Sequence, residues 1–287
     1  MKEKRMVWKR GAGRPVMKMQ EKGGVPWLYF PSFEESGLVR HGFSTRLGGV
    51  SRGDCATMNF ALNRGDEPAN VRENYRRMAA AMGFRPERMV LSKQTHTTNI
   101  RRVTEEDAGK GYDRERDYQD IDGLMTDVPG LVLVTSYADC VPLLFLDPVR
   151  RVIAASHSGW RGTAQRMGRH TVEAMRDAYG CRPEDLLAGI GPSICQECYE
   201  VSEDVAQVFA AEFGTDEAVL RPRPEQPGKY LLNLQEANRR ILMEAGVPEE
   251  NIAVTDICTC CNKELLFSHR GSQGRRGNMA AFLSLRD

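Results

Sequence analysis

The chain lacks a dominant charge of one sign. Its 287 residues carry 40 Lys and Arg against 39 Asp and Glu, so the formal net charge is +1. Proteins with a dedicated nucleic-acid surface usually carry a marked basic excess, and this balance argues against nucleic acid as a partner. No apolar run approaches the roughly 20 residues that a membrane-spanning helix needs. We therefore expect neither nucleic acid nor a membrane among its partners.

The N-terminal region lacks the apolar core of a signal peptide. Residues 1–22 are basic instead, with eight Lys and Arg and no continuous apolar run of signal-peptide length. Short basic tails of this kind are typically solvated. We therefore expect a disordered basic extension over 1–22, a single catalytic domain over 23–287, and a cytoplasmic location.

The sequence also lacks the common nucleotide-binding motifs. Neither a Gly-rich dinucleotide fingerprint nor a Walker motif follows a predicted strand, which argues against a dinucleotide cofactor or ATP. Eight cysteines are present, and without an export signal they are expected to stay reduced, so that clustered ones indicate metal binding or catalysis. Cys195-x-x-Cys198 and Cys258-x-Cys260-Cys261 could form a second metal site. The spacing of the latter is not that of a standard zinc ribbon, so reduced structural thiols are the default interpretation.

Short apolar runs dominate the middle of the chain. Those at 131–134, 141–146 and 152–155 are bounded by Pro, Gly and Asp, which predicts buried strands. Near-helical spacing of apolar residues predicts helices at 67–82, 165–179, 203–213 and 235–245. Strands outnumber helices and do not alternate strictly with them, so mixed sheets with outer helices fit better than a doubly wound fold.

Three potential metal ligands lie at predicted strand ends. His96, Cys140 and His157 offer two imidazoles and one thiolate, a suitable set for a catalytic zinc ion with a fourth position left open. The same residues permit a Cys140 nucleophile activated by His157. An unreactive buried cysteine is the third possibility.

Several ordered motifs resemble one known family. They are His41-Gly-Phe-Ser-Thr-Arg-Leu-Gly-Gly-Val-Ser51, Gln94-Thr-His96, Asp122-Gly-Leu124, Ala138-Asp-Cys-Val-Pro-Leu143, His157-Ser-Gly-Trp-Arg-Gly-Thr163, and Ile190-Gly-Pro192 with Tyr199-Glu-Val201. Together they resemble the purine nucleoside phosphorylase and adenosine deaminase family. It was formerly called the multicopper polyphenol oxidase or laccase-domain family and includes the peptidoglycan-editing factor. The resemblance extends from about residue 27 to the C-terminus.

The resemblance implies a fold, a metal and two reactions. The implied fold is α+β, a four-layer α/β/β/α sandwich of mixed sheets related to the deamidase domain of a cytotoxic necrotising factor. Zinc is implied on His96, Cys140 and His157. The implied activities are phosphorolysis of adenosine, inosine, guanosine and methylthioadenosine, and deamination of adenosine, which makes nucleosides and phosphate the expected partners. The tail departs from the family pattern at His269 and Gly271, which weakens any substrate contact transferred to it.

The implied chemistry needs an anion site. Arginine recognises phosphate through two parallel hydrogen bonds, so Arg46 beside Gly49, in a loop that could form a backbone anion nest, and Arg161 are the candidates. A plain turn at Gly49 and a structural ion pair for Arg161, with Asp139 or Asp122, remain open alternatives.

Deamination also needs a carboxylate that moves protons. The available carboxylates are Asp139, Asp122 and Glu200. We assign Asp139 to the catalytic group, with Cys140 and His157, and Asp122 to substrate binding. Tyr199 could stack on a purine, although core packing is the usual role of an isolated aromatic side chain.

Two other functions compete with this interpretation. One is a Cys140–His157 hydrolase or amidase that acts on a peptidoglycan precursor. The other is a copper phenol oxidase, with Cu in place of Zn. The second needs several copper ions and many more histidines than the five present.

Overall fold

The computed structural model describes residues 6–11, 15–214 and 216–287, whose strands form three sheets. The first sheet has the order β1 (Lys18–Lys22), β2 (Val25–Tyr29), β3 (Val39–Ser44), β15 (Met279–Leu285), β7 (Val132–Tyr137) and β4 (Met89–Leu91). The second has the order β14 (Ile252–Val254), β10 (Leu187–Ile190), β8 (Val141–Asp147), β9 (Val152–Ser158), β6 (Gly123–Thr126) and β5 (Ile100–Arg102). The third contains β11 (Glu200–Ser202), β13 (Lys229–Leu232) and β12 (Leu220–Pro222). The two large sheets are mixed, since β7 pairs antiparallel with β15 and parallel with β4, and β10 pairs antiparallel with β8 and parallel with β14.

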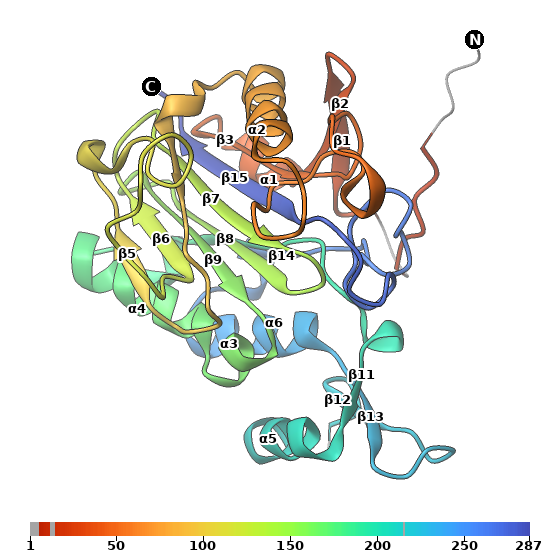
Figure 1. Ribbon diagram of the computed structural model, residues 1–287. Coiled ribbons are helices and arrows are strands. Elements are labelled where there is room, and N and C mark those ends of the chain that lie inside the picture. The colour runs from red at the N-terminus through yellow and green to blue at the C-terminus, as the bar shows by residue number, and fades with distance from the viewer. Residues whose placement is uncertain (1–5, 12–14, 215) are drawn as a thin grey trace.

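Helices cover the outer faces of the two large sheets (Figure 1). The α-helices are α1 (Pro31–Glu35), α2 (Pro68–Met82), α3 (Trp160–Ala164), α4 (Met167–Tyr179), α5 (Glu203–Phe213) and α6 (Leu234–Glu244). Single 3-10 turns occur at Gly53–Cys55, Pro86–Arg88, Glu105–Asp107, Pro183–Asp185, Gln196–Cys198 and Glu249–Asn251. Helix α2 shares a buried cluster with the first sheet, whereas α4 and α6 share one with the second. The four-layer α/β/β/α arrangement expected from the resemblance is confirmed.

Alternation along the central strands explains this layering. In β8, Leu144 and Leu146 join the core between the two sheets, whereas Leu143 and Phe145 join the cluster under α4 and α6. Because successive side chains of a strand point to opposite faces, an uninterrupted apolar run is buried on both sides. All seven residues of β8 and all seven of β9 are buried accordingly.

The predicted helices are present with small shifts at their ends. Helix α2 has Pro68 in its first turn and ends at Gly83, whose φ of 78° is the left-handed conformation that glycine adopts readily. The predicted helix at 165–179 begins two residues later, as α4, and follows the separate short helix α3. The three-stranded sheet packs with α5, and Phe209 and Leu232 belong to the cluster that also lines α4.

The N-terminal segment differs from expectation. Lys18–Lys22 forms β1, which pairs along its whole length with β2, and Met17 is fully buried. The predicted disordered extension therefore does not hold for residues 9–11 and 17–22. The amides of Lys9 and Gly11 donate to Asn262 Oδ1 and to the Asp256 carbonyl, and residues 18–22 complete the free edge of β2. Residues 1–5 and 12–14 of the same prediction lie outside the described residues. Within the described part of the chain, none of the helices combines the length and the apolar character that crossing a membrane requires.

Candidate active site

A crossover between the two large sheets positions the central cysteine. Strand β7 belongs to the first sheet and β8 to the second, and residues 138–140 connect them. Asp139 lies in this crossover with a φ of 83°. Its carboxylate accepts hydrogen bonds from Thr259 Oγ1 at 2.6 Å and from the Arg270 amide at 2.7 Å, and its carbonyl accepts one from the Ile194 amide at 3.0 Å. These contacts fix Cys140 at the start of β8.

The three predicted ligands meet at this point. One donor atom from each of His96, Cys140 and His157, hereafter the triad, lies within 4.8 Å of the others. The two imidazole rings are 5.0 Å apart and nearly perpendicular, at 75°. Gly159 lies against the triad, and a Cβ atom there would be only 3.0 Å from the Cys140 sulfur and from His96 Cδ2. Close approach of the ligands therefore requires glycine at this position.

A buried carboxylate orients both histidines. Asp122 Oδ1 lies 2.8 Å from His157 Nδ1 and accepts the His96 amide at 3.1 Å. Its Oδ2 accepts the amides of Thr95 and Thr97 at 2.9 and 3.1 Å, and the Thr97 hydroxyl at 3.2 Å. With Nδ1 held by the carboxylate, Nε2 of His157 is directed toward the other two ligands. Asp122 is thus a positioning residue, since it is fully buried and does not line the pocket described below.

The triad is electrostatically coupled. Burial raises the pKa of the Cys140 thiol, but the charge of His157 and hydrogen bonds from both histidines outweigh it and lower the pKa to about 6. Burial lowers the pKa of His157, yet the Cys140 thiolate and Asp122 raise it to about 9. The histidines and the carboxylate behind His157 thus favour the deprotonated form of the Cys140 sulfur.

This donor set fits a zinc ion. Zinc binds thiolate and imidazole at about 2.0–2.3 Å, so one ion can bridge donor atoms separated by the distances found here. The carboxylate behind His157 is the usual partner of a metal-binding histidine. Three protein ligands would leave one position for water or substrate.

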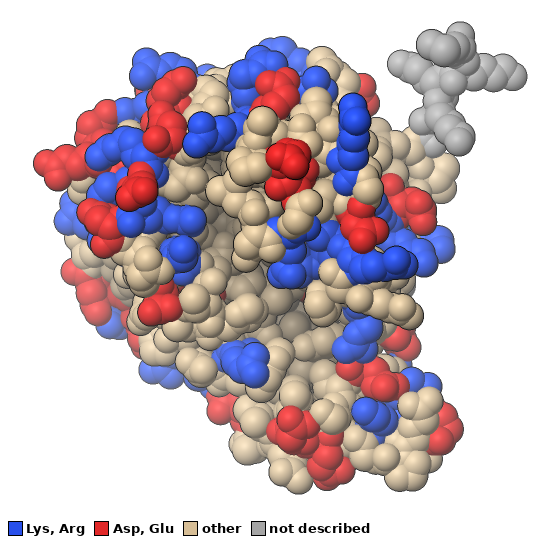
Figure 2. All heavy atoms as spheres, viewed as in Figure 1, with Lys and Arg blue, Asp and Glu red and all other residues tan. Residues whose placement is uncertain are grey.

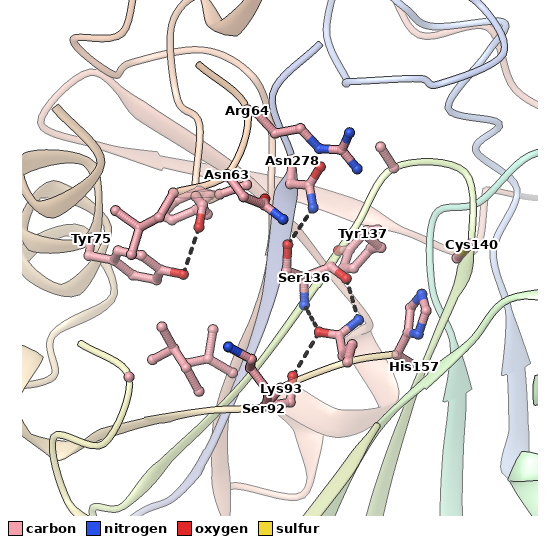
Figure 3. A pocket seen from close by; sticks show the side chains of 18 of the residues that line it. Asn63, Arg64, Tyr75, Ser92, Lys93, Ser136, Tyr137, Cys140, His157 and Asn278 are labelled. Atoms are coloured by element: carbon pink, nitrogen blue, oxygen red, sulfur yellow. Dashed lines mark hydrogen bonds between the residues drawn. The ribbon is translucent and has the colours of Figure 1, made fainter. Parts of the chain in front are cut away.

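A pocket of about 400 Å³ opens beside the triad. Figure 2 shows this face hollowed near its centre, with Lys and Arg side chains at several points of the rim. Figure 3 shows Cys140 and His157 at one side of the pocket and Tyr75 at the opposite side, with Ser136 and Lys93 between them. The volume lies within the usual range for small-molecule sites, about 300–1,000 Å³.

Apart from the triad, the charged side chains among the described residues that line the pocket are all cationic. Arg64, Lys93, Arg116 and Arg276 line it, and no Asp or Glu does. Arg276 is only 9% exposed, and its Nε has no hydrogen-bond partner among the described residues. Burial and the nearby charge of Arg64 lower the pKa of Arg276 to about 10. A buried guanidinium with a free donor beside a second arginine indicates an anion site.

None of these four cations was predicted from the sequence. Lys93 could have been found, because it precedes Gln94-Thr95-His96 at the same strand end. Arg64 and Arg276 come from loops distant in sequence, and no local pattern marks them.

The predicted phosphate residues lie elsewhere. Arg46 donates from Nε to the Ala56 carbonyl at 2.9 Å and from a terminal nitrogen to the Lys263 carbonyl at 2.8 Å, so two of its five N–H donors bind backbone within the fold. Gly49 lies against the backbone of Thr57, where a Cβ atom would meet the carbonyl oxygen at 2.1 Å. Neither residue lines the pocket. The glycine therefore serves close backbone packing.

Two further candidates also lie outside the pocket lining. Arg161 is exposed and stacks over the Trp160 ring at 4.4 Å, without an ion pair to Asp139 or Asp122 among the described residues. The Tyr199 ring is covered by Arg270 at 5.4 Å. Burial, with a smaller contribution from the Cys140 thiolate, raises the pKa of Tyr199 to about 12. The structure thus brings the triad together with Asp122 and Asp139. Arg161 and Tyr199 do not line the pocket.

Known proteins resemble this chain over nearly its whole length. Purine nucleoside phosphorylase YlmD of Geobacillus stearothermophilus is 38% identical over 274 residues, which is 95% of this chain and 98% of that protein. Adenosine deaminase RL5, from an unknown prokaryotic organism, is 33% identical over 231 residues, 79% of this chain and 87% of that protein. The crystal structure of G. stearothermophilus YlmD superposes with a TM-score of 0.86 at 36% identity, covering 96% of this chain and 100% of that one.

A family model described as multi-copper polyphenol oxidoreductase laccase matches residues 40–286. This range contains the triad, Asp122 and all four cations of the pocket. The chain therefore belongs to that laccase-like family, whose curated relatives carry the names purine nucleoside phosphorylase and adenosine deaminase.

Proposed function

We propose that this protein is a zinc-dependent purine nucleoside phosphorylase that also deaminates adenosine, acting in the cytoplasm on adenosine, inosine, guanosine and methylthioadenosine. The observation that carries the proposal is that the triad opens into a pocket whose other charged side chains are all cationic. The names of the similar proteins YlmD and RL5 support the same two reactions.

The cationic side chains supply the phosphate site of this proposal. Phosphorolysis replaces the bond from C1′ of the ribose to the purine nitrogen by a bond from C1′ to a phosphate oxygen. The incoming phosphate must be held against C1′, and its negative charge must be balanced. Arg276 and Arg64 suit this role, because charge-assisted hydrogen bonds from guanidinium groups are short, strong and directional. They replace Arg46 and Arg161 as the proposed phosphate ligands.

A polar network in the pocket can orient the nucleoside. Gln94 is fixed to Ser136, whose carbonyl accepts the side-chain amide at 2.6 Å and whose amide donates to Gln94 Oε1 at 2.7 Å. Asn278 donates to the Ser136 hydroxyl at 2.8 Å (Figure 3). Groups held in this way lose little entropy when they bind a substrate.

The triad would hold zinc through His96, Cys140 and His157. A bound zinc ion supplies Lewis-acid polarisation of a group placed at its open position. The chain's own residues orient the ligands: Asp122 holds the proton of His157 at Nδ1, and Gly159 leaves room for the sulfur. We propose Asp139 as a positioning residue as well, since both carboxylate oxygens are engaged by Thr259 and Arg270.

The test combines metal content with activity. Purified protein should contain zinc and release hypoxanthine from inosine only when phosphate is present. Cys140→Ala should lose this activity and contain one zinc equivalent fewer than the parent, because one of the three ligands of the triad is removed. Cys181→Ala is the matched control, since that thiol is buried in the cluster under α4, away from the pocket. Full activity and unchanged zinc content in Cys140→Ala would refute the ligand assignment.

A cysteine hydrolase or amidase is the second candidate, favoured by the low pKa of Cys140 beside His157. A thiolate paired with an imidazolium is also the resting state of a cysteine nucleophile. The two proposals differ in their response to chelation. A nucleophile should remain active in metal-free protein and be inactivated by alkylation of Cys140, whereas the zinc enzyme should lose activity on chelation and regain it with zinc.

The placement of the histidines disfavours a multi-copper oxidase, despite the family description. Within the described residues, only His96 and His157 of the five histidines share a candidate metal site. His41 is buried in the core, where its Nε2 accepts the Phe30 amide at 2.9 Å. His170 lies on the surface of α4 near Glu173. A multi-copper cluster needs a larger convergent set of histidines than this pair.

A further inference from the structure

A second group of sulfur atoms lies apart from the pocket. Cys195, Cys198, Cys258 and Cys261 each place Sγ within 4.8 Å of the others, and none of them lines the pocket. The sulfurs of Cys198 and Cys261 are 3.5 Å apart. Cys260 is excluded from the group, and its sulfur lies beside Gly271 instead. The cluster thus consists of two C-x-x-C pairs, a pattern that the neighbouring cysteine at 260 conceals in the sequence.

The backbone around the cluster is arranged to stabilise a charged sulfur. The amides of Cys195 and Cys261 both donate to the Cys258 sulfur, at 3.3 and 3.4 Å. Each C-x-x-C segment forms a turn, since the Cys198 amide donates to the Cys195 carbonyl at 3.1 Å and the Asn262 amide donates to the Cys258 carbonyl at 3.2 Å. Hydrogen bonds of this kind to ligand atoms orient them and tune their charge in metal sites.

We propose that these four cysteines bind one structural zinc ion as a closed tetrathiolate site. Two C-x-x-C pairs are a common ligand set for structural zinc, which is four-coordinate and tetrahedral and leaves no position open. Binding displaces the thiol protons as Zn²⁺ takes four thiolate ligands, so no oxidant or reductant is needed. The site differs in this respect from the triad, which offers three ligands and faces a pocket.

The zinc ion would join two loops that support the active site. Cys195 and Cys198 follow β10, and Cys258 and Cys261 follow β14. Thr259 lies between the second pair and donates to the Asp139 carboxylate at 2.6 Å. Zinc would therefore hold the loop that fixes the crossover carrying Cys140. The proposal does not depend on which reaction the pocket performs.

Zinc binding is favoured over disulfide formation by the number and arrangement of the thiols. All four sulfurs approach one another, whereas two disulfides need only two close pairs. Both amides that donate to sulfur converge on Cys258. A thiolate that accepts two amide hydrogen bonds suits a metal ligand, which keeps its negative charge. Disulfides are the alternative outcome of the experiment.

The experiment compares metal content among cysteine variants of the full chain. Protein produced with zinc in the medium is analysed by elemental analysis and by native mass spectrometry. Cys261→Ser and Cys195→Ser should each contain one zinc equivalent fewer than the parent, with a midpoint of thermal unfolding lower by several degrees. Cys260→Ser, next to the cluster but outside it, should match the parent in both measurements. The difference between variants is informative whatever the triad binds.

Cobalt substitution of the parent protein makes the test independent of variant folding. Metal-free protein refilled with Co²⁺ should show the intense visible and sulfur-to-metal charge-transfer bands of a tetrahedral tetrathiolate. These bands should be absent from Cys261→Ser and retained in His157→Ala. Equal zinc content in parent and Cys261→Ser, no tetrathiolate spectrum in the parent, or a denatured mass showing two disulfides would each overturn the proposal.

Discussion

The buried carboxylate of Asp122 should control metal affinity more strongly than any other residue that does not touch the metal. Asp122→Asn keeps the size and shape of the side chain but turns one acceptor oxygen into a donor. If the new NH₂ group replaces Oδ1, it faces the His96 amide and His157 Nδ1. If it replaces Oδ2, it faces the amides of Thr95 and Thr97. Either orientation opposes at least two donors.

The expected magnitude follows from the hydrogen bonds that are lost. A hydrogen bond to a charged group contributes about 1.5–3 kcal/mol, so two of them correspond to about 3–6 kcal/mol of lost stability for the apoprotein. Substitutions behind a metal-binding histidine typically reduce metal affinity about 10- to 100-fold. We expect both effects, because the same carboxylate anchors the loop of His96 and sets the tautomer of His157.

Chelator competition and urea unfolding measure the two effects separately. The matched control is Asp120→Asn, two residues away in the same segment, whose exposed carboxylate accepts only the Thr95 hydroxyl among these donors. The control should bind zinc and unfold as the parent does. If Asp122→Asn also keeps the parent's zinc affinity and stability, the assigned role of Asp122 is wrong.

Three further substitutions probe the site and the core. Gly159→Ala should weaken zinc binding about tenfold, because the added methyl group overpacks against the triad. Gly162→Ala is the control and should not weaken it, since the nearest atom to a Cβ there is 3.5 Å away. The same chelator competition measures both variants. In initial-rate assays, Arg276→Met should raise the KM for phosphate by about 10- to 100-fold, which corresponds to the loss of one charge-assisted hydrogen bond. Arg161→Met is the control and should leave this KM unchanged. Burial lowers the pKa of His41 from 6.5 to about 3, so the folded state binds fewer protons than the unfolded state between these two pH values. The free energy of unfolding should therefore be highest above pH 6.5 and fall as the pH is lowered toward 3, by at most about 1.4 kcal/mol per pH unit. His41→Gln should remove this part of the slope in urea unfolding at pH 7, 6 and 5.

The mixed sheets and the outer helices could be predicted because they follow from local patterns, whereas their stacking into four layers was implied by the family resemblance. The apolar runs of β8 and β9 are buried on both faces, as continuous runs indicate. The helix that ends at Gly83 has its stop signal in the sequence. Strand β1 was missed because Lys18–Lys22 is polar and largely exposed, and only its pairing with β2 makes it a strand. Local composition does not contain that information.

The candidate site divides in the same way. His96, Cys140 and His157 were recognisable because ligand residue types occur at the ends of buried strands. The anion site was not, since Arg276 and Arg64 become neighbours only through tertiary folding. Arg46 was predicted to bind phosphate because paired glycines follow it closely. In the structure its guanidinium donates hydrogen bonds to backbone carbonyl groups of other segments. A short motif shows which side chain could bind a ligand. Tertiary contacts determine whether its donors are already used in hydrogen bonds within the protein.

The position of Asp139 links the two sulfur-containing sites. Its backbone and both carboxylate oxygens bind three segments, at Ile194, Thr259 and Arg270. The first two of these lie next to the cysteines of the tetrathiolate cluster. A strained left-handed conformation at a residue other than glycine persists only where the surroundings impose it, and these three contacts impose it here. The geometry of Cys140 in the triad therefore depends on loops that belong to the other sulfur cluster, so loosening that cluster should reach the active site through Asp139.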